Sequence, residues 1–326
     1  MELRVANWNI KWMNKWFVGD NEKPSFKNCH KIADLASRVA KVIKKMDADL
    51  INIQEGPSRK EEMELFVKDF LRDKYEVIGP GGKGQQKLYT LARNDTKALK
   101  CSVLNKEDMD FFNSCWDVAI KSNFRPEKYC FTRPPLVVRV KTVSDRELRL
   151  LNLHLKSKYV HEGEKMWKDE CEREKFVKKA VKARRRISAE AMRVREYLNA
   201  LFAADRKVNI VVTGDLNDGP GLDYFERSYL THNIADQIGG SPNSPQQMLR
   251  HAFIDTMDKD CNYTAVFDDF IENIKEKKVL LDHILVSPNL FWTGKKRTTV
   301  GKIEHKIFKK FGSPSDHRPQ TATIKI

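Results

Sequence analysis

The sequence lacks several features that would assign a protein to a class at once. None of its 326 residues belongs to an apolar run near the roughly 20 residues that span a bilayer. Glu2 and Arg4 argue against a signal peptide at the start, and no linker, low-complexity segment or internal repeat divides the chain. We therefore expect one folded domain over residues 1–326, in the cytoplasm and without membrane insertion.

Cysteine is scarce and irregularly spaced. The six cysteines form no CxxC pair and no repeating pattern: Cys29, Cys101, Cys115, Cys130, Cys171 and Cys261. This usage excludes a zinc knuckle and favours reduced, mostly buried thiols over a disulfide framework. A phosphate-binding glycine loop is missing as well, because GPGGKG at Gly79–Gly84 lacks the GxxxxGK[ST] spacing and a following helix. We interpret it as a mobile surface loop.

Basic residues, by contrast, are in excess. The chain has 60 Lys and Arg against 45 Asp and Glu, a formal charge of +15 and a pI near 9.4. Residues 156–207 carry 16 basic and 9 acidic residues, and residues 293–326 carry 9 and 2. Such a surface attracts polyanions such as nucleic acid or anionic lipid headgroups, although interleaved acids in the first segment are also typical of a solvated helix face.

Short β-branched runs alternate with helical patterns, which predicts an α/β protein. The predicted strands are 3–10, 50–54, 136–140, 148–155, 208–213, 279–286 and 321–326. The predicted helices are 29–46, 59–71 and 162–202. The aromatic-rich region from Cys101 to Lys128 has no assigned role, and is either a specificity lobe or a satellite core.

Polar side chains recur at the ends of these strands. The residues are Asn9, Glu55, His154, Asp215, Asn217, Asp282 and His283. Taken singly, an Asn or Asp after a strand is usually a turn former. Their recurrence at five of the strands instead predicts one cleft, because strand ends at one rim of a sheet direct side chains to a common point.

The motifs in series resemble the endonuclease/exonuclease/phosphatase superfamily. They are WNI at 8–10, QE at 54–55, NLHLKS at 152–157, GDLND at 214–218, LDHILVS at 281–287 and SDHRP at 315–319. The resemblance covers nearly the whole chain. It implies a four-layered sandwich of two mixed β-sheets flanked by helices.

The resemblance also implies a metal site. Glu55 takes the place of the principal metal carboxylate, assisted by Asn9 and Asp316. Hard oxygen ligands of this kind suit Mg²⁺ or Mn²⁺. In the superfamily the SDH histidine pairs with the acid of the LDHILVS-like motif, which corresponds here to His317 with Asp282.

The remaining implied residues act on the attacking water and the phosphate. Asp215 resembles the acid that orients or deprotonates the water, and Asn217 and His154 resemble hydrogen-bond donors to phosphate oxygens. Lys156, expected on the same strand face as His154, adds positive charge. FTRPPL at 131–136 matches a further motif, in which Arg133 either contacts the phosphate or braces the rim.

These residues predict a metal-dependent phosphoesterase but leave its substrate open. The basic charge favours a nuclease acting on DNA or RNA, with Trp8, Trp12 or Trp16 available to stack on unpaired bases, although core packing is the expected role of Trp8. The alternative is a phosphatase or phospholipase acting on an inositol phosphate or lipid phosphate, against which stands the lack of a recognisable exposed aromatic hairpin. A fold that has lost catalysis is disfavoured because every site position is filled. The sequence indicates no protein partner.

Overall fold

The computed structural model describes residues 2–19, 23–27, 30–96, 98–104, 106–120, 125–230, 233–252, 262–291, 303–308 and 314–326. Cys29, Cys261, Phe124 and part of the basic segment 293–326 lie outside the described residues, as does the side chain of Cys101. Within the described part of the chain, no helix has the length and apolarity that crossing a membrane requires.

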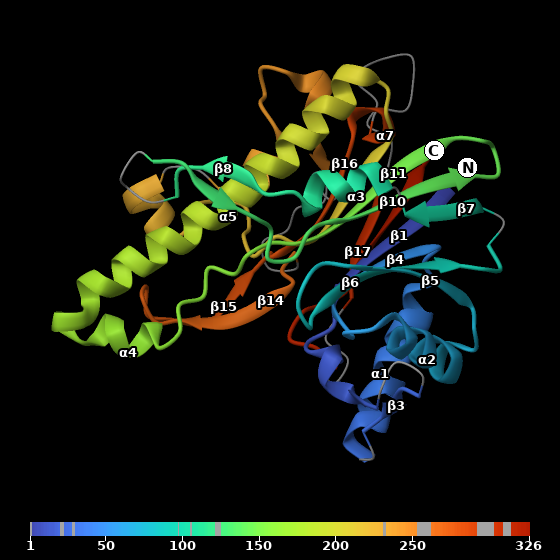
Figure 1. The fold of residues 1–326 in the computed structure, drawn as a ribbon, viewed down its shortest axis with the longest axis horizontal. Coiled ribbons are helices and arrows are strands. Elements are labelled where there is room, and N and C mark those ends of the chain that lie inside the picture. The colour runs from blue at the N-terminus through green and yellow to red at the C-terminus, as the bar shows by residue number, and fades with distance from the viewer. Residues whose placement is uncertain are drawn as a thin grey trace.

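Two mixed sheets form the centre of the protein (Figure 1). The first has the order β17 (Glu304–Ile307), β18 (Gln320–Lys325), β1 (Glu2–Asn9), β4 (Leu50–Gly56), β6 (Lys87–Arg93) and β5 (Tyr75–Gly81). The second has the order β13 (Arg250–His251), β16 (Asp282–Val286), β12 (Ile210–Asp215), β11 (Glu147–His154), β10 (Leu136–Thr142) and β7 (Leu99–Leu104). Within each sheet one central pair is parallel, β1 with β4 and β11 with β12, and the other pairs are antiparallel.

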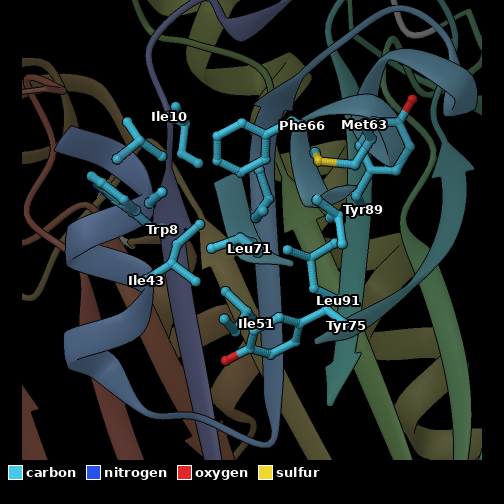
Figure 2. Packing of buried hydrophobic residues seen from close by; sticks show 14 of the residues in the cluster. Trp8, Ile10, Ile43, Ile51, Met63, Phe66, Leu71, Tyr75, Tyr89 and Leu91 are labelled. Carbon is cyan, nitrogen blue, oxygen red and sulfur yellow. The ribbon is translucent and has the colours of Figure 1, made fainter. Parts of the chain in front are cut away.

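Helices cover the outer face of each sheet. The first sheet packs against α1 (His30–Met46) and α2 (Lys60–Leu71), with Trp8, Ile43 and Phe66 in one buried cluster (Figure 2). The second packs against α5 (Glu170–Ala204), α3 (Lys106–Asn113) and α6 (Ile234–Gly239). A third cluster, which includes Val5, Val138 and Val211, lies between the two sheets. The predicted four-layered α/β sandwich is therefore confirmed.

Smaller elements complete the fold. They are the 3₁₀ turns Met13–Trp16 and Pro245–Gln247, the π turn Glu226–Leu230, α7 (Pro288–Phe291), and three two-stranded ribbons: β2 (Phe17–Val18) with β3 (Ser25–Phe26), β8 (Trp116–Val118) with β9 (Glu127–Tyr129), and β14 (Ala265–Asp269) with β15 (Ile274–Val279). Phe111, Phe112 and Trp116 pack with the α5 face of the second sheet, so these aromatic residues of the unassigned region belong to the core.

Two predicted elements are in fact divided. The region 162–202, predicted as a single helix, consists of α4 (Gly163–Lys168) followed by α5. The break lies at Asp169, whose backbone is extended. Its side chain caps the N-terminus of α5 by accepting from the backbone N–H of Cys171. The strand predicted over 279–286 is the end of β15 and the whole of β16. Part of the predicted glycine loop is also strand, since Gly79–Gly81 ends β5.

The β14–β15 hairpin corrects another expectation. Val266, Phe267 and Ile274 are 38%, 46% and 42% exposed on it, so an exposed hairpin with an aromatic side chain does exist. The turn of the hairpin packs through Phe270 and Ile271 on a small cluster formed by α4 and the start of α5. Four consecutive charged residues, Lys275–Lys278, hid this hairpin in the sequence, because such a run matches no strand pattern.

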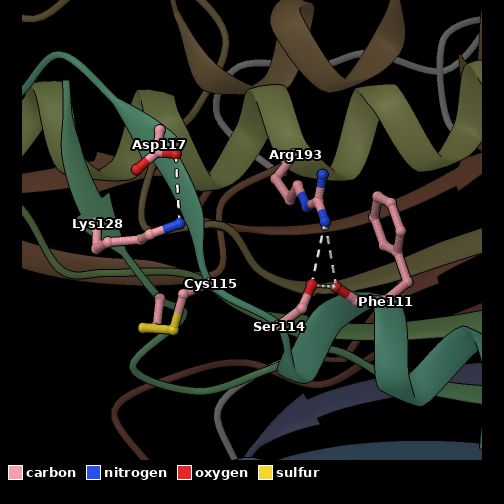
Figure 3. Close-up of a disulfide and its surroundings, with 7 residues drawn as sticks. Phe111, Ser114, Cys115, Asp117, Lys128 and Arg193 are labelled. Carbon is pink, nitrogen blue, oxygen red and sulfur yellow. Dashed lines mark hydrogen bonds and ion pairs between the residues drawn. A yellow bond between two sulfur atoms is a disulfide. The ribbon is translucent and has the colours of Figure 1, made fainter.

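The expectation of reduced thiols is wrong for one pair. Cys115 and Cys130 form a disulfide across the β8–β9 ribbon (Figure 3). Their separation of 15 residues matches no sequence motif, and strand pairing alone brings them together. Cys171 is a free, exposed thiol. Disulfides are rare in reducing compartments. The argument for a cytoplasmic location from reduced cysteines therefore no longer holds, and that location stays a prediction.

Candidate active site

The alternation of side chains along the strands builds the site. On β1, Leu3 and Val5 face the second sheet, and Asn7 and Asn9 continue the same row. On β11, Leu148 and Leu150 lead in the same way to Asn152 and His154. The same phase brings Asp215 of β12 and Asp282 of β16 to the space between the sheets, which is apolar at one end and polar at the other.

A buried amide network joins the two sheets beneath the site. The Gln54 side chain donates to Asn7 Oδ1 at 2.8 Å and to Asn152 Oδ1 at 2.6 Å. One layer deeper, Asn52 Nδ2 donates to Thr213 Oγ1 at 2.7 Å. Hydrogen-bonded polar groups of this kind fix the register between sheets that apolar side chains alone would leave adjustable. This network is a supporting feature that sequence reasoning missed.

Asp215 is the centre of the site. It is 2% exposed, and its Oδ2 accepts from Asn9 Nδ2 at 2.9 Å. The same oxygen lies 3.6 Å from His154 Nε2 and 3.9 Å from His317 Nε2. Burial raises the pKa of Asp215 to about 6, although the positive charge of His317 opposes this rise. The group is therefore ionised at neutral pH yet close to its protonation point.

His317 and Asp282 form a tight pair. The imidazole Nδ1 lies 2.6 Å from Asp282 Oδ2; the Asp282 side chain is buried and that of His317 is partly buried. Burial lowers the pKa of His317, but the negative charges of Asp282 and Asp215 outweigh it and raise this pKa to about 10. His317 is thus an imidazolium at neutral pH. Trp8 Nε1 donates to its carbonyl oxygen at 3.1 Å and holds the loop in place.

His154 has the opposite charge state. Burial lowers its pKa well below the usual value, and the positive charges of Arg133 and His317 lower it further. A neutral imidazole beside an imidazolium gives the site two different hydrogen-bond donors.

Glu55 reaches the site through a bulge. The β4–β6 register shifts between Ile53 and Gly56, and Glu55 adopts a left-handed φ of +55°. Without the bulge its side chain would follow Ile51 and Ile53 toward the helices. Instead, its carboxylate lies 3.5 Å from Asn9 Nδ2 and accepts from Gln86 Nε2 at 2.6 Å and from the Trp12 backbone N–H at 3.0 Å.

Two of the predicted metal residues, Glu55 and Asn9, lie together, and the loop of the third adjoins Asn9. Ser315 Oγ donates to the Asn9 carbonyl at 2.7 Å, which brings the Asp316 loop beside Asn9. The Asn9 Oδ1 atom is buried without a hydrogen-bond partner, so one acceptor there is unused. Asp316 is half exposed and pairs with Lys11 Nζ at 2.8 Å. Burial raises the pKa of Asp316, but the Lys11 hydrogen bond and the positive charges of His317 and Lys11 together outweigh it, so this pKa is lowered.

A different trio has the spacing of metal ligands, namely Asp215, Asp282 and His317, whose ligand atoms lie within 4.8 Å of one another. The Nδ1 of His317 is already hydrogen-bonded to Asp282, and a protonated imidazole does not bind metal. We therefore interpret this trio as a hydrogen-bonded acid–histidine relay. The all-oxygen set of Glu55, Asn9 and Asp316 fits Mg²⁺ or Mn²⁺ better.

Comparisons with known proteins agree with this architecture. No protein-family model and no curated protein matches the chain. Among solved structures, the chain is similar over its full length to a truncated TDP2 of Caenorhabditis elegans, at a TM-score of 0.56 and 15% identity over 98% of that chain. It is similar to an endonuclease/exonuclease/phosphatase protein of Bacteroides vulgatus, at a TM-score of 0.53 and 13% identity over 100% of this chain and 99% of that one.

The chain has the fold of the endonuclease/exonuclease/phosphatase superfamily. Two further structures broaden the comparison. A Danio rerio TDP2, described in complex with a single-strand DNA product, matches with a TM-score of 0.54 and 14% identity over 100% of this chain and 99% of that one. A mannosyl-6-phosphatase of Bacteroides thetaiotaomicron matches with a TM-score of 0.50 and 15% identity, over 99% of this chain and 100% of that one.

Within this superfamily fold, three predicted phosphate-binding residues take less direct positions. Asn217, at φ +52°, donates through its side chain to the Leu155 carbonyl at 2.9 Å. Arg133 donates to the carbonyls of His154 and Leu155 at 3.0 and 2.7 Å, which is the bracing arrangement. Lys156 lies beyond the end of β11, so the expected shared strand face with His154 is wrong.

Several residues at the site were missed from the sequence. Gln86 and the Trp12 backbone hold Glu55, Lys11 pairs with Asp316, and Thr264 Oγ1 accepts from the Asp282 backbone N–H at 3.1 Å. Gln86 and Thr264 lie far in sequence from every predicted strand end, and only folding brings them to the site.

Proposed function

We propose that the protein is a divalent-metal-dependent phosphodiesterase and, more specifically, a nuclease. The observation that carries the proposal is the convergence of Asn9, His154 and the Asp282-paired His317 on one carboxylate, Asp215. An ionised acid with a raised pKa, next to one cationic and one neutral imidazole, suits hydrolysis of an anionic ester.

In the proposed reaction Asp215 orients a water molecule and accepts its proton as the oxygen attacks phosphorus and the ester P–O bond opposite breaks. His317 meets the charge that develops on the phosphate oxygens, and His154 donates a hydrogen bond without adding charge. Glu55, with Asn9 and Asp316, would hold Mg²⁺ or Mn²⁺, which supplies further positive charge to the phosphate when bound. Asn217 and Lys156 remain our proposed phosphate contacts.

Nucleic acid is the substrate that the surroundings favour. The chain carries a formal charge of +15. Trp8 and Trp16 are buried, whereas Trp12 is 47% exposed and its backbone N–H is bonded to Glu55. Lys15 Nζ lies 3.1 Å from the centre of the Trp12 ring. An exposed indole with an ammonium group at the site rim suits a base stacked beside a phosphate.

The alternative is a phosphatase or phospholipase. The mannosyl-6-phosphatase shows that this fold accommodates another phosphate ester. The exposed β14–β15 hairpin leads through Leu280 and Leu281 directly to Asp282, so an apolar surface is connected to the site. Exposed apolar side chains next to lysines also suit an anionic membrane surface.

One panel separates these substrates. The full chain, with Mg²⁺, Mn²⁺ or EDTA, is assayed on single-stranded DNA, plasmid, RNA, a hexose 6-phosphate and vesicles containing phosphoinositides. We expect metal-dependent cleavage of a nucleic acid that weakens steeply with salt. Cleavage of only the sugar phosphate or the lipid would replace the nuclease proposal, and no hydrolysis in any arm would end it.

Trp12 variants test the stacking. Trp12→Ala is expected to raise KM for a single-stranded oligonucleotide by about 10-fold, because base stacking on an aromatic ring contributes roughly 1–3 kcal/mol. Trp12→Phe retains a ring and is expected to retain most of the affinity. An oligonucleotide of abasic residues keeps the phosphates without the bases, and equal effects of Trp12→Ala on both substrates would contradict stacking.

A further inference from the structure

Glu190 is a buried acid that the proposed reaction does not use. It lies on α5, in the outer layer, and is 1% exposed. Its Oε2 accepts from the Lys156 backbone N–H at 2.7 Å, and its Oε1 accepts from the Tyr129 hydroxyl at 3.0 Å. An ionisable group is seldom buried this deeply unless its partners require it.

The contacts of Glu190 lead to the catalytic rim. Lys156 follows His154 by two residues, so the Glu190 bond fixes the chain where it leaves β11. Arg133 holds the same turn from the other side through the carbonyls of His154 and Leu155. The two side chains, of opposite charge, thus hold consecutive backbone groups of one turn.

The charges of Arg133 and Glu190 also depend on each other. Burial raises the pKa of Glu190, and the hydrogen bonds from Lys156 and Tyr129 together with the positive charge of Arg133 oppose this rise. Burial lowers the pKa of Arg133, and the negative charge of Glu190 opposes this more than any other group does. The positive charge of Arg133 in turn lowers the pKa of His154. Loss of the Glu190 charge would leave the partly buried guanidinium of Arg133 with only the weaker opposing charges of Asp215 and Glu55.

The β8–β9 ribbon orients the second oxygen of Glu190. Tyr129 ends β9, next to Cys130, and its ring packs edge-on against Trp116 with centroids 5.2 Å apart. The Cys115–Cys130 disulfide closes this ribbon, and Arg193 of α5 donates to Ser114 Oγ at 3.2 Å (Figure 3). The ribbon therefore holds Tyr129 at a fixed place over α5.

We propose that Glu190 is a positioning residue for the active site. It sets the backbone turn after His154 and compensates the charge of Arg133, and so fixes the orientation and charge state of His154 without touching the substrate. Tyr129 is its orienting partner. This role rests on the proposed phosphoesterase function of the site.

Kinetics of the full-length protein with Mg²⁺ test the role. Glu190→Ala is expected to lower kcat on the cleaved oligonucleotide by 10- to 100-fold, on the order that misplacing a reacting group costs, with KM nearly unchanged. Glu190→Gln is expected to restore only part of kcat. Its amide oxygen can accept from Lys156 while its N–H donates to the Tyr129 hydroxyl, but it lacks the charge that compensates Arg133. Tyr129→Phe is expected to lower kcat less than Glu190→Ala.

The matched control is Glu174→Gln, an exposed acid on the same helix that pairs only locally with Lys178. It is expected to leave kcat unchanged. A Glu190→Ala protein that unfolds cooperatively and retains the parent kcat would overturn the proposal. If Glu190→Ala fails to fold, the Tyr129→Phe variant tests the proposal instead. A folded Tyr129→Phe protein that has the kcat of the parent and the His154 NMR signals of the parent would overturn the positioning role of Glu190.

A second measurement separates this role from the proposed function. Side-chain NMR of His154 in the metal-free protein reports its environment without catalysis. We expect Glu190→Ala and Tyr129→Phe to shift the His154 ring signals while Glu174→Gln does not. If the parent protein hydrolyses no phosphate ester, the proposed function fails but this shift still tests the positioning. Unchanged His154 signals in both variants would refute it.

Discussion

The His317–Asp282 pair allows the most direct test of the site. The shift in the pKa of His317 from 6.5 to about 10 corresponds to about 5 kcal/mol between its two protonation states. This energy comes mainly from Asp282 and Asp215, against the opposing effect of burial. Asp282→Asn keeps the shape of the side chain and removes its charge. A hydrogen bond to a charged group contributes about 1.5–3 kcal/mol, so we expect the pKa of His317 to fall by about one to two units.

The expected result is a change in the pH dependence of kcat/KM. Because the pKa of His317 is raised, its imidazolium is present at low and neutral pH and is lost only as pH rises through about 10. The basic limb of the profile should therefore move down by about one to two pH units in Asp282→Asn. The contribution of this charge pair to the free energy of unfolding depends on pH in the same way. It is fully present below the ordinary histidine pKa and is lost as pH rises toward about 10.

Asp316→Asn is the control for this experiment, because Asp316 bonds Lys11 and not the imidazole of His317. We expect it to raise the metal concentration needed for half-maximal activity and to move the basic limb much less. Histidine NMR titration measures the pKa of His317 in both variants directly. If Asp282→Asn leaves both the basic limb and that pKa in place, Asp282 does not set the charge of His317, and the division of roles between the two acids is wrong.

Three further predictions concern catalysis and stability. Asp215→Asn should lower kcat by roughly 10²- to 10⁴-fold and remove the acid limb of the pH profile near pH 6. Because the parent protein loses stability as pH rises through the raised pKa of Asp215, the variant should have a higher unfolding temperature than the parent above about pH 6. A lower unfolding temperature would contradict the assignment. Gly214→Ala should lower the free energy of unfolding in urea by roughly 3 kcal/mol or more, because Gly214 has φ +148° and a Cβ there would collide with the Leu153 carbonyl. A decrease of less than about 1 kcal/mol would refute this prediction. Replacing Cys115 and Cys130 by serine should lower the free energy of unfolding by up to about 3 kcal/mol for a loop of this length. The measurement is the urea midpoint of the variant against that of the oxidised parent, and equal midpoints would refute the prediction.

The position of the site at the polar end of the inter-sheet space follows largely from side-chain alternation. Leu3 and Val5 define the inner face of β1, and a period of two places Asn9 on that face. The same reasoning holds for His154 and Asp215. Local patterns of this kind are written in the sequence because each strand must separate its two faces.

Glu55 shows where this reasoning stops. Its place in the alternation directs it toward the helices, and only the bulge at β4 turns it to the site. The bulge depends on pairing with β6 and on Gln86, some thirty residues away. The β8–β9 disulfide and the division between α4 and α5 depend in the same way on partners that no local pattern reveals.

By itself the sequence determined the α/β class, the strands that carry the site and the motif residues at their ends, whereas the layered sandwich was implied by the resemblance of its motifs. The first three follow from periodicity and residue type, which act over a few neighbours. Only the tertiary structure decided that His317 is an imidazolium, that Arg133 bonds backbone carbonyls and that Glu190 lies behind His154. Charge state and hydrogen bonding depend on burial and on the groups facing a residue, and those groups come from distant parts of the chain.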